Sequence, residues 1–252
     1  MAAEFKFLKV RIDKGVALVT LDRPDKMNSL SMAVRDEIEQ CFTSLETGKD
    51  VGSVVLTGGE DTFCPGFDIV EVMNVGIEAF THRILEYHLN IYGFTKPVVA
   101  AVSGFALAGG FDLALCGDII IVSETAMFGH PEIRFGVNPL LSPLWRKVGL
   151  SKAVEIAMTG EMINAEEAHR IGLVNKVVAP GGVVNEAFEV ARKLTKIDLR
   201  ALAAVKRASM VAPRLDIEAG LEYEFGLSAS IFQESNLKSK VEAYARKIGL
   251  IE

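Results

Sequence analysis

The chain has 252 residues, of which 50% are hydrophobic and 24% charged, so it is long enough for one large domain or a core with a small appendage. This composition excludes disordered, collagen-like and disulfide-scaffold proteins. A formal charge of −6 and a pI near 5.4, without a run of lysine or arginine, argue against a nucleic-acid or anionic-membrane surface.

The cysteines and the N-terminus indicate a cytoplasmic protein. Cys41, Cys64 and Cys116 are odd in number and lack metal-ligand spacing, so we expect no disulfide framework and no metal site. The first residues include charged side chains and no apolar run of signal-peptide length, which predicts no secretory targeting. The charge-free stretch 97–111 is shorter than a membrane helix and contains glycines, so we expect no membrane segment.

Strands and helices alternate along the first part of the chain. Residues 7–21 have the pattern of a hairpin with a turn at Lys14-Gly15, and Ser31 is typical of a helix cap. Further expected elements are a strand at 52–56, a helix at about 76–92, a strand at 97–102, a short helix at 112–116 and a strand at 119–122. This alternation predicts an α/β layered core with parallel strands.

From Val184 onward the pattern becomes helical. Four segments have helical spacing, at about 184–196, 199–210, 215–232 and 235–247. Roughly the last quarter of the chain is therefore predicted to be a helical appendage.

Two glycine-containing segments follow predicted strands. The first runs from Gly58-Gly59 to Phe67-Asp68, and the second from Ser103 to Asp112. Turns of this kind expose backbone N–H groups at the carboxyl end of a sheet, and a helix that starts near Gly109 offers further donors to an anion. The alternative for the first segment is an ordinary strand-to-helix turn, and the alternative for the second is close packing of a helix on a strand.

Two carboxylates are embedded in apolar and glycine-rich sequence. Asp112 lies near the start of the short helix, and Glu132 follows Gly129-His130-Pro131. Two such acids can divide acid and base work across one bound water. The alternative is a pair of capping or salt-bridged carboxylates, with Arg134 as a partner.

The remaining polar and aromatic candidates indicate structural roles. His130 is expected to be a turn or core histidine, because no third metal ligand has a suitable spacing. His82, His88 and His169 are interpreted as surface residues. Trp145, among prolines and leucines, is expected to pack in a pocket wall or in the core.

In order along the chain, these segments resemble the enoyl-CoA hydratase/isomerase (crotonase) superfamily. The matching blocks are Leu21 through Leu30, Phe63 through Ile69, Lys96 through Asp118, Phe128 through Gly136, and Thr159 through Val174. The resemblance implies a ClpP/crotonase-like spiral of β-β-α units, with a core and acyl-CoA site in residues 1–195. It further implies a C-terminal helical oligomerisation region in residues 196–252 that builds a homotrimer, or a homohexamer as a dimer of trimers.

The resemblance also assigns roles to site residues. The backbone amides of Phe67 and Gly109 would form the oxyanion hole for the thioester oxygen, and the Phe67 loop, including Asp68, Ile69 and Val70, would line the path of coenzyme A. Coenzyme A would be part of the substrate, and no further cofactor is expected. Arg23 or Lys26 could meet phosphates, on grounds of charge only.

Asp112 and Glu132 fall at the catalytic positions of the hydratases, but two features depart from the family pattern. Asp112 stands where hydratases usually have glutamate, which resembles dienoyl-CoA isomerases, although Leu140 replaces the further aspartate of those enzymes. The stretch 138–145 contains leucines and prolines in place of a glycine-rich loop, which suggests an altered acyl pocket.

We therefore expect an enoyl-CoA hydratase that adds water reversibly to a 2-enoyl-CoA through an enolate, with Asp112 and Glu132 as catalytic residues. The alternatives are an enoyl-CoA or dienoyl-CoA isomerase that uses Glu132 alone, a hydrolase or decarboxylase of the same superfamily, and a catalytically silent acyl-CoA binder.

Overall fold

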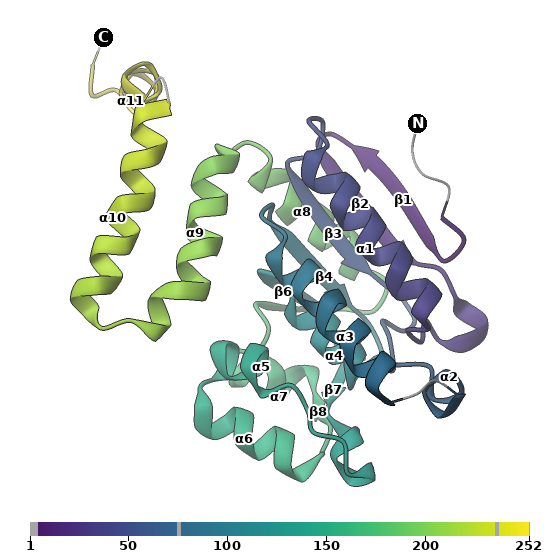
Figure 1. The fold of residues 1–252 in the computed structure, drawn as a ribbon. Coiled ribbons are helices and arrows are strands. Elements are labelled where there is room, and N and C mark those ends of the chain that lie inside the picture. Colours follow the sequence, from purple (N-terminus) through teal and green to yellow (C-terminus); the bar gives the residue numbers. More distant parts are fainter. Residues whose placement is uncertain (1–4, 75–76, 235–236, 252) are drawn as a thin grey trace. The chain divides into compact units, whose positions relative to one another are not determined.

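The structure is a computed structural model that describes residues 5–74, 77–234 and 237–251 (Figure 1). The chain divides into two compact units, Met1–Lys196 and Ile197–Glu252. No helix in these described ranges is long and apolar enough to cross a bilayer.

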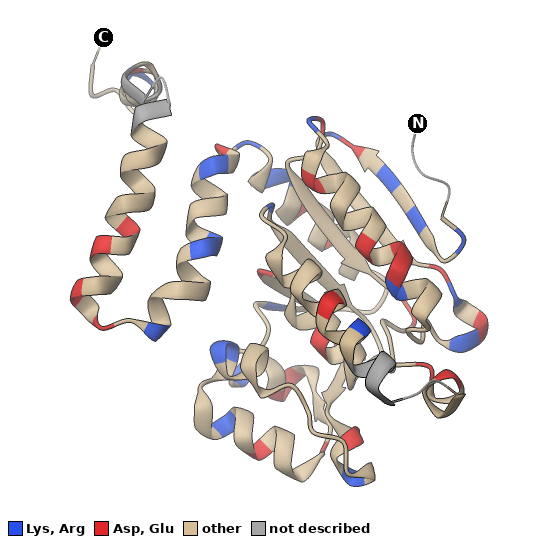
Figure 2. Cartoon of the chain, viewed as in Figure 1, with Lys and Arg blue, Asp and Glu red and all other residues tan. Residues whose placement is uncertain are grey.

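A large sheet forms the centre of the first unit. Its six described strands, in spatial order, are β1 (Leu8–Asp13), β2 (Val16–Leu21), β3 (Ser53–Thr57), β4 (Val98–Val102), β6 (Ile119–Ser123) and β9 (Lys176–Val178). The strands β1 and β2 form the expected antiparallel hairpin, and all other neighbours are parallel. Both faces of this sheet are covered by helices, and the strands β3, β4 and β6 accordingly contain no charged residue, as Figure 2 shows.

A smaller sheet contains β5 (Phe105–Leu107), β7 (Met127–Gly129) and β8 (Ile163–Asn164). The chain passes from a strand of the large sheet to a strand of the small sheet and then into a helix, as in β4, β5 and α4 (Gly109–Leu115). This repeated turn confirms the predicted α/β spiral of β-β-α units.

Helices cover the large sheet on both faces. The helices α1 (Met32–Thr47) and α3 (Ile77–Gly93) contribute to the main hydrophobic cluster on one face, and α8 (Val183–Leu194) packs against the other. Successive side chains of β3 point to opposite faces of the sheet, so Val54 and Leu56 belong to the first cluster and Val55 to the second. Ser31 accepts a hydrogen bond from Val34 N at 3.3 Å, which confirms the predicted cap of α1.

The remaining elements of the first unit are short. They are η1 (Pro24–Lys26), α2 (Ile69–Asn74), η2 (Pro131–Phe135), α5 (Leu141–Val148), α6 (Leu150–Thr159) and α7 (Ala165–Arg170).

The second unit consists of helices, as the sequence predicts. They are α9 (Leu199–Val211), η3 (Ala212–Arg214), α10 (Ile217–Glu234) and α11 (Leu237–Lys247). Several large apolar side chains of α10 are exposed, among them Ile217 and Phe225. The role of this unit in oligomerisation stays a prediction.

Candidate active site

Two loops lie side by side because the chain repeats the same turn. Cys64 and Ala106 form a parallel bridge, in which Leu107 N donates to Cys64 O at 3.0 Å. Phe67 lies three residues beyond Cys64, and Gly109 lies three residues beyond Ala106. This equal offset brings the Phe67 ring directly against the backbone of Gly109.

The backbone around Phe67 directs its amide to one side. Leu30 N donates to Gly66 O at 2.8 Å, and Asp68 N donates to Leu30 O at 3.1 Å. In a bridge of this pattern the intervening residue turns its own N–H in the opposite direction, so the Phe67 amide points away from Leu30. Gly66 permits the turn with a φ of +115°, and a Cβ there would lie 3.0 Å from Leu107 O.

The turn before α4 contains an unusual backbone conformation. Ala108 has φ 49° and ψ −127°, which costs a residue with a Cβ on the order of 1–3 kcal/mol. A hydrogen bond from Ala108 N to Gly129 O at 2.9 Å ties this residue to β7. Gly109 N donates no hydrogen bond within the described part of the chain, as expected for the first residue of a helix. The strained turn therefore presents the Gly109 amide next to the Phe67 loop.

Asp112 is the fourth residue of α4, and it is 3% exposed. Its Oδ1 atom has no hydrogen-bond partner among the described residues. Burial raises the pKa of Asp112 well above its ordinary value, and the nearby charge of Glu132 raises it further. The site therefore favours the protonated form of Asp112 and couples it electrostatically to Glu132.

Glu132 is held by a histidine. It lies in η2, and its Oε1 atom is 2.8 Å from Nδ1 of the fully buried His130. This confirms His130 as a core histidine. The sequence offered Arg134 as an alternative partner for Glu132, but Glu132 contacts His130 and Arg134 is exposed. The Oε2 atom is buried and has no hydrogen-bond partner within the described ranges. One oxygen of Glu132 thus contacts His130, and the other has no hydrogen-bond partner among the described residues.

His88 was expected on the surface, and this expectation is wrong. It is only 7% exposed, and its Nε2 atom is 3.9 Å from Asp112 Oδ2. The reason is its place on α3, where it shares a helical face with the buried Tyr87 and Ile91. The 3.6-residue spacing of these apolar neighbours is the signal that would have placed His88 inside. His82, on the same helix, is exposed as expected.

Ion pairs anchor the Phe67 loop to the preceding segment. Arg23 pairs with Asp68 at 2.9 Å, with both side chains 16% exposed. Burial alone would raise the pKa of Asp68, but hydrogen bonding to Arg23 and the charge of that guanidinium outweigh this effect and lower it. Arg23 and Asp68 are therefore engaged with each other.

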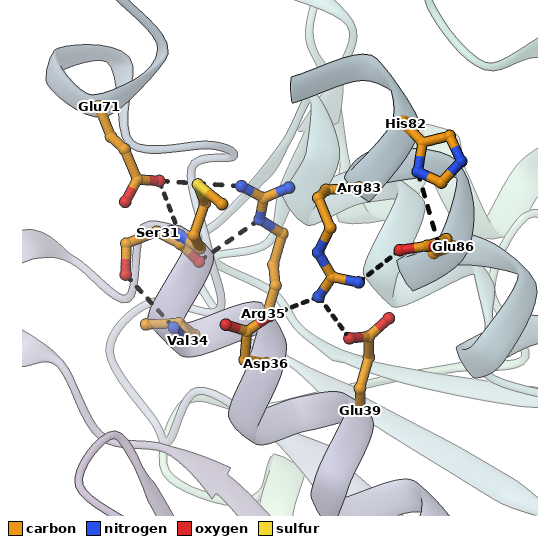
Figure 3. A network of polar contacts seen from close by, with 10 residues as sticks. Ser31, Val34, Arg35, Asp36, Glu39, Glu71, His82, Arg83 and Glu86 are labelled. Atoms are coloured by element: carbon orange, nitrogen blue, oxygen red, sulfur yellow. Dashed lines mark hydrogen bonds and ion pairs between the residues drawn. The ribbon is translucent and has the colours of Figure 1, made fainter. Parts of the chain in front are cut away.

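A second anchor involves α1. Glu71 accepts a hydrogen bond from Met32 N at 2.7 Å and lies 3.8 Å from Arg35, as Figure 3 shows. The Arg35 guanidinium lies 5.2 Å from the centre of the Phe67 ring. In the same view, Arg83 of α3 pairs with acidic residues of α1, which fixes the helix that carries His88.

The other expected binding residues differ in exposure. Ile69 and Val70, at the start of α2, are 69% and 64% exposed, so their side chains are accessible at the edge of the site. Leu140 precedes α5, and Trp145 packs against the main core as predicted, with the Arg146 guanidinium 4.6 Å from its ring centre. Among the described residues no three histidine, cysteine or acidic side chains gather into a metal site.

Together these features define a class of site. Two adjacent backbone turns lie in the same site as the buried Asp112, whose pKa is raised by burial, and Glu132, which contacts His130. Amide pairs stabilise negative charge that develops on a carbonyl oxygen, and coupled acids move protons next to it. The α/β spiral thus carries a site suited to enolate chemistry.

Comparison with known proteins identifies the family. A model of the enoyl-CoA hydratase/isomerase family matches residues 11–249. A probable enoyl-CoA hydratase of Rhizobium meliloti (strain 1021) is 36% identical over 247 residues, which are 96% of each chain. A probable mitochondrial enoyl-CoA hydratase of Dictyostelium discoideum is 36% identical over 92% of this chain and 85% of that one. The crystal structure of an enoyl-CoA hydratase from Bacillus anthracis has a TM-score of 0.90 at 28% identity, with 96% of this chain and 97% of that chain covered. The chain belongs to the enoyl-CoA hydratase/isomerase family.

Proposed function

We propose that the protein is an enoyl-CoA hydratase, which adds water reversibly to the double bond of a 2-enoyl-CoA and yields the 3-hydroxyacyl-CoA. The observation that carries this proposal is a pair of acids near the strained turn at Ala108, since Asp112 Oδ1 and Glu132 Oε2 are both buried without a hydrogen-bond partner among the described residues. Relatives named as hydratases support it.

The amides of Phe67 and Gly109 would form the oxyanion hole. Negative charge develops on the thioester oxygen when the enolate forms, and two preorganised donors stabilise that charge by several kcal/mol. The ring of Phe67 and the exposed side chains of Ile69 and Val70 would lie along coenzyme A, while Asp68 acts through its ion pair with Arg23.

Glu132 would move the proton, and Asp112 would orient the water. In hydration, the water oxygen forms a bond to carbon three as Glu132 takes a proton from that water, and Glu132 then delivers the proton to carbon two. Asp112 keeps its own proton and orients the water through a hydrogen bond. The pair therefore starts and ends each turnover with one proton, which matches the raised pKa of Asp112.

Turnover of crotonyl-CoA, followed as loss of the conjugated chromophore, tests the assignment. We expect the wild-type protein to consume the substrate and the double variant Asp112→Asn, Glu132→Gln to lose at least about 100-fold in kcat. Wild-type activity in the double variant would refute the assignment of the acids. The exposed Asp25→Asn, in η1, serves as the control.

A double-bond isomerase is the second candidate. Burial favours protonated Asp112, which leaves Glu132 as the base, and one base is sufficient to shuttle a proton along an acyl chain. Exchange of deuterium into the alpha carbon, together with a shifted double bond and no hydrated product, would favour the isomerase. Tight binding of enoyl thioesters without either reaction would favour a silent binder.

We also propose a cytoplasmic homotrimer or homohexamer. The exposed apolar side chains of α10, including Ile217 and Phe225, would be covered by other copies of the chain. Light scattering tests the assembly, and a monomer at micromolar concentration would contradict it.

A further inference from the structure

His88 is a buried titratable side chain to which the proposed reaction gives no role. It lies in α3, and its ring stacks on Tyr92 with centroids 6.3 Å apart and meets the edge of Phe67 at 6.5 Å. Tyr92 in turn donates a hydrogen bond to Asp112 O at 2.6 Å. The imidazole therefore lies between the Phe67 loop and α4, the helix that carries Asp112.

The contacts of the ring define its tautomer. Nδ1 lies 2.7 Å from Ile84 O, and a carbonyl oxygen can only accept, so Nδ1 carries a proton. In the neutral ring, Nε2 is then an acceptor. Nε2 is buried, has no hydrogen-bond partner among the described residues, and has Asp112 Oδ2 at 3.9 Å.

The charges around the ring favour the neutral form. Burial lowers the pKa of His88, and Arg35 on α1 acts in the same direction, against the opposing effect of the hydrogen bond to Ile84 O. Burial also raises the pKa of Tyr87 and Tyr92, the two phenols beside it, well above the ordinary value. The acidic groups that complete these surroundings are Asp112 on α4 and, beyond it, Glu132 on η2.

We propose that His88 is a positioning residue, which accepts a hydrogen bond from the protonated carboxyl group of Asp112 through Nε2 and thereby fixes where Asp112 keeps its proton. The observed separation exceeds a hydrogen bond by roughly 1 Å, a gap that a small shift of the carboxyl group on substrate binding would close. Catalytic hydrogen bonds are commonly long before the substrate binds.

A hydrogen bond to His88 would fix the orientation of the Asp112 carboxyl group. With its O–H directed to His88, the carbonyl oxygen of Asp112 can accept a hydrogen bond from the substrate water in a single orientation. Glu132 has an analogous partner, because His130 holds its Oε1. Each acid thus lies beside a buried histidine, Asp112 beside His88 and Glu132 beside His130. As an account of catalysis, this inference rests on the proposed hydratase function.

Substitutions at position 88 distinguish the role of Nδ1 from the role of Nε2. Asparagine places a polar group near the position of Nδ1, and glutamine places one near that of Nε2. We expect His88→Asn to lower kcat by about 10- to 100-fold with little change in KM, because the carboxyl group loses its orientation. His88→Gln should recover most of kcat. His82→Asn, at an exposed histidine of the same helix, is the matched control and should resemble the wild type.

Infrared spectroscopy provides a readout that does not require turnover. A protonated carboxyl group has a C=O stretch that an ionised one lacks, so a band present in the wild type at neutral pH and absent from Asp112→Asn belongs to Asp112. We expect that band to shift in His88→Asn and to stay unchanged in His82→Asn. This result would support the inference even if the wild type hydrated no enoyl-CoA, in which case only the proposed function would fail. The inference is overturned if the wild type lacks the band or if His88→Asn leaves it unshifted. Where the wild type is active, equal kcat in folded His88→Asn and His88→Gln overturns it as well.

Discussion

Gly109 faces the ring of Phe67 so closely that a Cβ at position 109 would lie 2.7 Å from Cε2 and 2.8 Å from Cζ. Real Cβ atoms do not approach other atoms at this distance, so glycine is required for the ring to stay in place. The contact joins the two residues whose amides are proposed to bind the thioester oxygen. A change at Gly109 should therefore affect the reaction through the geometry of both donors.

Gly109→Ala is expected to fold and to lose activity. The methyl group must displace the Phe67 ring and its loop, and loss of one oxyanion donor costs about 100-fold or more in kcat. Overpacking should cost about 1–3 kcal/mol of unfolding free energy. Crotonyl-CoA kinetics and thermal unfolding measure the two effects. Gly93→Ala, at the end of α3, is the control, because a Cβ there would have no other atom within 4 Å. Near-normal turnover by folded Gly109→Ala would refute the role of this contact.

Asp112→Asn should stabilise the protein increasingly as the pH rises. The folded-state pKa of Asp112 is raised, so below about pH 4 the side chain is protonated in both states and costs little. Above that pH the unfolded chain ionises first, and the wild type loses up to about 1.4 kcal/mol of unfolding free energy per pH unit until the folded state ionises too. Asparagine has no such loss.

Denaturant unfolding of both proteins at several pH values between about 4 and 8 tests this expectation. The advantage of Asp112→Asn should grow with pH, while the exposed Asp25→Asn should show no such trend. A difference that is constant with pH would mean that Asp112 is not protonated in the folded protein.

The ion pair of Arg23 with Asp68 should contribute to stability and to substrate binding. A double-mutant cycle with Arg23→Gln and Asp68→Asn is expected to give a coupling energy of about 1–3 kcal/mol, since the pair is largely buried. The pKa of Asp68 is lowered, so this stabilisation is present above about pH 4 and is lost as the pH falls through the folded-state value. Each single variant should raise KM, because the Phe67 loop loses an anchor.

The exposed pair of Lys9 and Asp22, with Lys9 74% exposed, provides a matched comparison. Its coupling energy should stay within about 0.5 kcal/mol. Equal coupling in the two pairs would show that the Phe67 loop does not depend on Asp68.

Local signals in the sequence were sufficient for much of the fold. Alternation from Phe7 to Ile12, followed by the Lys14-Gly15 turn and an apolar segment at 16–21, predicts the hairpin. The apolar run at Val98 predicts a strand buried on both faces. The strands β5 and β7 were not predicted, since three residues are too few to establish a period. Family resemblance supplied the pairing of Phe67 with Gly109, which the Cys64 bridge now explains geometrically.

Parts of the site depend on contacts that no local pattern encodes. Ala108 has a positive φ and donates its amide to Gly129 O, 21 residues later in the chain, and the partner of Asp68 is an arginine 45 residues earlier. The place of His88 could have been found, because it lies on the apolar face of α3. Its proximity to Asp112 could not, because that depends on how α3 and α4 pack.

His130 should affect catalysis through Glu132 alone. Nδ1 of His130 is the contact of Glu132 Oε1, and asparagine places a polar group near that position while leucine does not. We expect His130→Asn to keep substantially more kcat than His130→Leu, with KM similar in both, because neither variant changes the oxyanion loops. Both should lose stability, since the native ring is fully buried against Phe111. Unfolding midpoints identify that shared loss. If the two variants have equal kcat, the hydrogen bond to Glu132 has no part in positioning the base, and the carboxylate must be held by packing alone.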